Sequence, residues 1–109
     1  MNTASDAVNS PIGYWATKDS QLGEVGWKIT STDFKKCTVV LGGKITEETG
    51  VAQIDGNRVK YTFKGKDEEY TATYHSDDNT LTEDQLLKLR YMRADDSKIN
   101  ELNHQGCHL

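Results

Sequence analysis

The chain has 109 residues and a formal net charge of −4, with 35% hydrophobic and 28% charged residues. This length suits a single domain with one modest core. No apolar run approaches the roughly 20 residues of a membrane-spanning helix, so we expect no membrane partner. Lysine and arginine do not gather in one block, which argues against a nucleic-acid partner.

Residues 1–11 are predicted to form a flexible N-terminal tail that ends at Pro11, the only proline. Residues 1–10 are polar and lack the basic start and apolar centre of a signal peptide. We therefore expect a cytoplasmic protein whose two cysteines stay reduced. Cys37 alternates with apolar neighbours and is expected to be a small buried side chain, whereas Cys107 lies near the C-terminus.

Alternation of apolar and polar residues with a period of two dominates the middle of the chain, as in half-buried β-strands. The runs are residues 25–29, 37–41, 59–63 and 70–74. The second run also has an apolar residue at Val40, so both faces of this strand are expected to be covered. Turn residues separate the runs, and Asp55-Gly56 suits a tight hairpin turn. We therefore predict antiparallel strands joined by short connections.

Two interpretations remain for residues 83–93. The segment 82–85 has the form of a helix-capping box, which favours a helix. Leu87, Leu89 and Tyr91 alternate with polar residues, which favours a strand, and we prefer a strand from about residue 86 to 93.

Residues 12–95 are predicted to form one domain that is mainly β, an antiparallel small β-barrel with a sandwich as the alternative. Both architectures give the same alternation. Residues 96–109 are expected to form a short C-terminal helix or a tail, because Ile99 and Leu102 lie three residues apart behind an acidic start.

The side chains predicted to point inward are rich in aromatic groups. They are Trp27, Tyr61, Phe63, Tyr70, Tyr74 and Tyr91. A buried tyrosine hydroxyl needs a hydrogen-bond partner. The interior is therefore either a filled core with satisfied hydroxyls or a cavity with an amphipathic wall that accepts a small ligand.

Gly13-Tyr14-Trp15 has a Gly-x-Trp form at the first predicted strand, and residues 69–74 form a tyrosine-rich strand. In these features the chain resembles a small lipocalin-like, calycin-type β-barrel. The resemblance implies that Arg93, or Arg90, on the last strand packs across Trp15 and closes the barrel floor. It also implies binding of a small apolar molecule.

Candidate chemical groups are sparse. His104, Cys107 and His108 lie close together at the C-terminus, but a structural zinc site needs four ligands, so we interpret this segment as a solvated tail. His75, beside Ser76 and two aspartates, is interpreted as an outward side chain at a turn. No catalytic, metal or cofactor motif is found, so we assign no catalytic residue, no metal ligand and no cofactor.

The leading hypothesis is non-catalytic binding of a small apolar or amphipathic ligand inside the barrel, by the six aromatic residues above. The alternative is a protein-interaction module with a filled core and an acidic, inhibitor-like surface, or a subunit of a small homo-oligomer. In that case the exposed face of residues 39–41 is the candidate interface of a homodimer.

Overall fold

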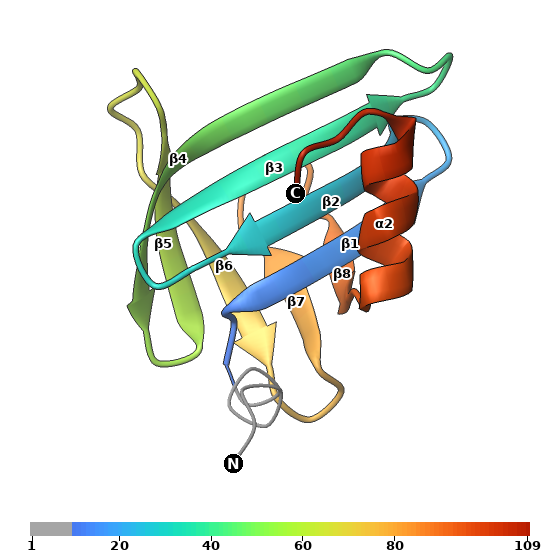
Figure 1. The fold of residues 1–109 in the computed structure, drawn as a ribbon. Helices are drawn as coiled ribbons and strands as arrows, with labels where there is room; N and C mark the ends of the chain where they lie inside the picture. Colours follow the sequence, from blue (N-terminus) through green and yellow to red (C-terminus); the bar gives the residue numbers. More distant parts are fainter. Residues whose placement is uncertain (1–9) are drawn as a thin grey trace.

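In the computed structural model, which describes residues 10–109, eight antiparallel strands close into a barrel (Figure 1). Each strand pairs with its chain neighbours, and the last pairs with the first. The strands are β1 (Gly13–Asp19), β2 (Gly23–Ile29), β3 (Asp33–Val40), β4 (Ile45–Asp55), β5 (Arg58–Phe63), β6 (Tyr70–His75), β7 (Thr80–Glu83) and β8 (Arg90–Arg93). The predicted mainly-β barrel is confirmed, and the sandwich alternative is wrong.

The up-and-down order gives the barrel two different ends. The end with connections 20–22, 41–44, 64–69 and 84–89 is called the mouth, and the end with connections 30–32, 56–57 and 76–79 is called the floor. Residues 1–9 of the predicted tail lie outside the described residues. Within residues 10–109, no helix has the length and apolar character needed to cross a membrane.

The barrel interior holds one cluster of buried apolar and aromatic side chains, contributed by alternate residues of all eight strands. Its members include Trp15, Trp27, Phe34, Tyr61 and Tyr91. Because side chains of a strand point alternately to its two faces, this inward set explains the alternation seen in the sequence.

A second layer covers part of the outside. Helix α2 (Asp96–Gln105) packs across β1, β2 and β3 (Figure 1) and buries Ile99 and Leu102 against the outer side chains of Ala16 and Val39. The C-terminal helix is thus confirmed. Gly26 lets the helix approach, because a Cβ atom there would lie 2.7 Å from Leu102 Cδ1. The expectation that the 37–41 strand is covered on both faces holds through Val39, but Leu41 is exposed.

The prediction that both cysteines stay reduced is wrong, although Cys37 is buried as expected. Cys37 and Cys107 form a disulfide, with Cα atoms 5.9 Å apart and a sequence separation of 70. Helix α2 returns the chain to the outer face of β3, and this brings the two residues together. Because structural disulfides are typical of oxidising compartments, the bond weighs against the cytoplasmic location predicted from the sequence.

The strand predicted over residues 86–93 is also too long. β8 begins only at Arg90, and residues 84–89 form the connection from β7. Leu86 and Lys88 adopt left-handed backbone conformations, with φ of 60° and 54°, which a strand cannot contain. The chain must reverse here because Thr82 of β7 pairs with Arg90.

Candidate functional site

Trp15 and Arg93 meet at the floor of the barrel. The Arg93 guanidinium lies 4.1 Å from the centre of the Trp15 ring, and the two residues are paired between β1 and β8. The guanidinium also donates hydrogen bonds to the carbonyl oxygens of Ser10 and Ile12 and to Oδ1 of Asn79. Burial lowers the pKa of Arg93. This end is therefore closed by a charged group with several acceptors.

Arg90, the other arginine considered for this role, does not reach Trp15. Its side chain is exposed and forms an ion pair with Asp78. Arg90 and Arg93 are an odd number of residues apart on the same strand, so their side chains point to opposite faces of the barrel wall.

The structure brings together five of the six aromatic residues predicted to line a pocket. The Trp27 ring lies 5.1 Å from Tyr61 and 5.3 Å from Tyr91, measured between ring centres. Phe63 and Tyr70 extend this group from Tyr61 toward the mouth, and both are partly exposed.

The sixth residue, Tyr74, lies at the floor. Its ring centre is 5.9 Å from that of Trp15, and its hydroxyl is 3.2 Å from Oδ1 of Asn79. Tyr74 therefore belongs to the closed end rather than to the aromatic group near the mouth.

A buried ion pair, which the sequence reasoning missed, lies beside these rings. Nζ of Lys36 is 2.7 Å from Oε2 of Glu83, and the Tyr91 hydroxyl donates to the same oxygen over 2.7 Å. The Lys36 and Glu83 side chains are only 11% and 1% exposed. Nζ of Lys36 also lies 4.9 Å from the centre of the Trp27 ring. Extending the alternation from Phe34 to Lys36 would have placed this lysine inside.

Two polar atoms next to the ion pair are buried without a hydrogen-bond partner. They are Nε1 of Trp27 and the hydroxyl oxygen of Tyr61. Burial, with a contribution from the nearby Glu83 charge, raises the pKa of Tyr61 far above its ordinary value, so this hydroxyl stays protonated. Leaving such groups unpaired costs about 1–3 kcal/mol each, a cost that a bound acceptor would offset.

The C-terminal segment is not the solvated tail predicted from the sequence. Cys107 is bonded to Cys37, and Nδ1 of His108 lies 3.1 Å from Oε1 of Glu47. The hydrogen bond from His108 lowers the pKa of Glu47. Among residues 10–109, no group of three or more potential metal ligands is found.

His75 ends β6 and makes a cross-strand contact. Its Nε2 lies 2.8 Å from the Thr82 hydroxyl of β7. The side chain is on the outer face of the barrel wall, since Tyr74, the residue before it, points inward. The imidazole of His75 therefore does not face the polar groups of the interior.

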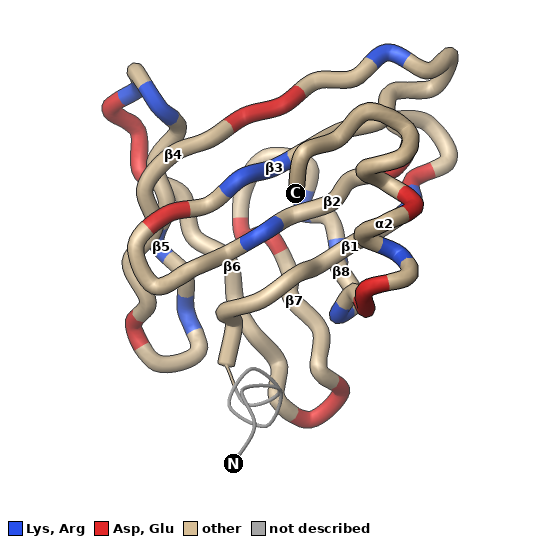
Figure 2. Tube along the Cα trace, in the orientation of Figure 1, with Lys and Arg blue, Asp and Glu red and all other residues tan. Residues whose placement is uncertain are grey.

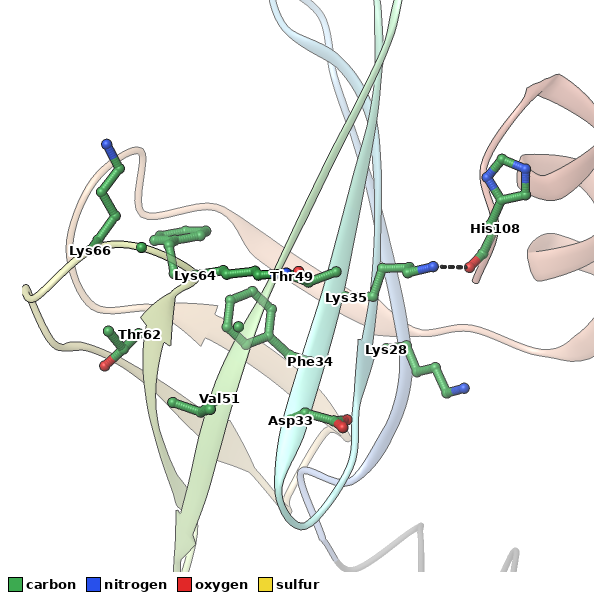
Figure 3. A pocket seen from close by; sticks show the side chains of 13 residues that line it. Lys28, Asp33, Phe34, Lys35, Thr49, Val51, Thr62, Lys64, Lys66 and His108 are labelled. Atoms are coloured by element: carbon green, nitrogen blue, oxygen red, sulfur yellow. Dashed lines mark hydrogen bonds between the residues drawn. The ribbon is translucent and has the colours of Figure 1, made fainter.

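The outside of the barrel carries a groove of about 650 Å³ over β3, β4 and β5 (Figure 3). We call it the lysine groove, because four lysines line it and Asp33 is the one acidic residue in its lining. Its lining residues are Lys28, Asp33, Phe34, Lys35, Thr49, Gly50, Val51, Thr62, Phe63, Lys64, Gly65, Lys66 and His108.

No family model, curated protein or solved structure matches the chain. The resemblance to lipocalin-like barrels therefore depends on the chain's own features, and it stays a hypothesis.

Proposed function

We propose that the protein is a non-catalytic binding barrel that takes a small, mainly apolar ligand into the mouth half of its interior. One observation carries the proposal, the pair of buried unpartnered donors at Trp27 Nε1 and the Tyr61 hydroxyl. They lie in an aromatic environment, and binding sites for small molecules combine such apolar walls with a few placed polar groups. A lipocalin-like barrel would have the same kind of function.

The charges beside the donors define the ligand further. Glu83 already neutralises Lys36, so an anionic ligand would add a second buried negative charge next to Glu83. A neutral oxygen acceptor, such as a carbonyl group, avoids this repulsion and offers an acceptor to these unpartnered donors. The preferred ligand is therefore an uncharged apolar molecule that carries one carbonyl group.

Access is expected from the mouth. The floor is closed by Trp15 and Arg93, whereas Phe63 and Tyr70 near the mouth are only partly buried. Since aromatic rings fill the interior, these two side chains are the ones that must move to admit a ligand.

A titration with methyl nonyl ketone, followed by tryptophan fluorescence, tests the proposal. Binding is expected to weaken about tenfold in Tyr61→Phe, the effect of losing one hydrogen bond worth about 1.4 kcal/mol. Tyr14→Phe is the matched control, because Tyr14 lies on the outside, in the layer under α2. Decanoate, which has a similar chain but a negative charge, should bind more weakly than the ketone.

Equal ketone affinity in Tyr61→Phe and the parent protein would contradict the proposal, as would tighter binding of decanoate. Non-denaturing mass spectrometry of the purified protein gives a second test. A neutral co-purified molecule that is retained by the parent and lost from Tyr61→Phe would support the interior site.

A further inference from the structure

The lysine groove differs in charge from the rest of the molecule. Its lining includes Lys28, Lys35, Lys64 and Lys66 but only one acidic residue, Asp33. The whole chain carries a net charge of −4, so the remaining surface is strongly acidic. Figure 2 shows basic residues on β2, on β3 and in the connection between β5 and β6, and acidic residues on β4 and further along the same connection. Such an asymmetric field attracts anionic partners to one face.

The centre of the groove is apolar. Val51 is 63% exposed there, and Phe63 lines the groove beside it. Gly50 pairs with Phe34 on one side and Phe63 on the other, and a Cβ atom at this position would lie only 2.6 Å from Phe34 Cε1. The Phe34 ring therefore packs directly against Gly50, and a side chain has no room at this position.

The lysines are spread along the groove and do not converge on one point. Lys66 and Lys28 lie at opposite ends of the view in Figure 3, and Lys35 turns toward the His108 carbonyl oxygen, to which it donates over 2.9 Å. Lys64 and Lys66 are exposed, and no ion pair within residues 10–109 involves them. A single small anion could contact only one or two of these charges.

We infer that the lysine groove is a docking surface for an acidic peptide segment of a partner protein. The segment is extended, with carboxylates on either side of an apolar side chain. The apolar side chain packs on Val51 and Phe63, and the carboxylates pair with lysines toward the two ends. The lysines and Val51 of this surface lie on the outer face of the barrel wall, whereas Phe34 and Phe63 are shared with the interior aromatic cluster.

The probe is a fluorescein-labelled nine-residue peptide with leucine at its centre, glutamates two and four residues to either side and serines between them, so that in an extended chain the leucine and all four glutamates share one face. Fluorescence anisotropy is the measurement. Lys64→Glu/Lys66→Glu is the test variant. Lys44→Glu/Arg58→Glu is the matched control, since it changes the net charge equally at exposed positions outside the groove. We expect the peptide to bind at least about tenfold more weakly to the test variant, and affinity for the parent to fall with added salt.

Equal weakening in both variants would overturn the inference, because it would reflect net charge alone. Failure of the parent protein to bind the peptide, or equal binding of the same peptide with lysine in place of each glutamate, would overturn it as well. Sedimentation of the parent and the test variant tests whether a second copy of the chain occupies the groove instead. A dimer that forms in the parent and is lost only in the test variant would overturn the peptide proposal in favour of self-association. Tyr61 does not line the groove, so Tyr61→Phe should bind the peptide like the parent, and this separates the groove from the proposed interior site.

Discussion

The guanidinium of Arg93 lies 4.1 Å above the indole ring of Trp15, at the point where the last strand of the barrel meets the first. The contact links the first strand, β1, to the last strand, β8, and closes the floor. Because the guanidinium also donates to backbone carbonyls near residue 12, it fixes the start of β1 against β8.

Trp15→Phe and Arg93→Ala are therefore expected to be strongly coupled. Each should destabilise the fold, Arg93→Ala by about 2 kcal/mol or more, since it leaves several buried acceptors unpaired. The double variant should lose less stability than the sum of the two single losses, by about 0.5–2 kcal/mol, the range of a partly buried cation–π contact. Denaturant unfolding of the four proteins measures this coupling. Met92→Ala, an exposed neighbour, should change stability by less than about 0.5 kcal/mol.

The disulfide between Cys37 and Cys107 should be a large stabilising contribution. It closes a loop of 70 residues, for which chain-entropy arguments give about 4 kcal/mol. Cys37→Ala/Cys107→Ala is expected to lower the free energy of unfolding by roughly this amount, and reductant should destabilise the parent but not the variant. If reductant leaves the unfolding midpoint of the parent unchanged, the bond does not contribute as described.

Gly50→Ala is expected to destabilise the barrel severely, by about 2 kcal/mol or more, through overpacking. The added methyl group would lie 2.6 Å from Phe34 Cε1 and closer still to the carbonyl oxygen of Thr62. Gly42→Ala is the control, because its Cβ would meet no atom within 4 Å and only its positive φ of 99° costs stability. Thermal unfolding should show a clearly larger loss for Gly50→Ala, and similar losses would contradict this explanation.

The ion pair between Glu24 and Lys98 attaches α2 to β2, with 2.9 Å between the carboxylate and ammonium groups. Hydrogen bonding to Lys98 lowers the pKa of Glu24 from its ordinary value of 4.5 and raises the pKa of Lys98 from 10.5. A lowered carboxyl pKa stabilises the fold above the unfolded value and loses this effect as pH falls through the folded value.

Glu24→Gln should therefore cost about 0.5–1 kcal/mol near pH 7, and the difference from the parent should vanish in acid. Glu101→Gln is the control, since Glu101 also contacts Lys98 but is 58% exposed. A cost of Glu24→Gln that is independent of pH would exclude the ion pair as its cause. Urea unfolding over a pH series provides the measurement.

Removing one member of the interior ion pair should be worse than removing both. Lys36→Met leaves the Glu83 carboxylate buried with only Tyr91 and a backbone N–H as donors, at an expected cost of about 3–5 kcal/mol. Lys36→Met/Glu83→Gln removes both charges but keeps an acceptor for Tyr91, so it should be more stable than Lys36→Met alone. A double variant that is no more stable than Lys36→Met would show that the uncompensated Glu83 charge is not the source of the cost.

Several local features could be predicted from the sequence. The inward positions of Trp27, Tyr61, Tyr74 and Tyr91 follow from alternation, because a strand with one buried face must place apolar residues at every second position. The C-terminal helix follows from Asp95, whose side chain accepts from the Lys98 backbone N–H, and from the spacing of Ile99 and Leu102.

The polar part of the candidate site was not predicted, although the same alternation extends to it. Lys36 and Glu83 look like surface residues because charged side chains are rarely buried unless they are paired. The two residues lie 47 positions apart in the sequence, and only closure of the barrel brings β3 and β7 to face each other across the interior. The length of β8 was misjudged for a related reason, since left-handed residues at 86 and 88 leave no pattern in apolar spacing.

By itself, then, the sequence determined the alternation of buried and exposed residues, the short turns and the start of the C-terminal helix, all of which depend on contacts within a few residues. Only the tertiary structure decided the barrel over a sandwich, the disulfide across 70 residues, the buried Lys36–Glu83 pair and the lysine groove. Each of these depends on which distant strands become neighbours. That choice is made by packing of the whole interior, and a local pattern does not encode it.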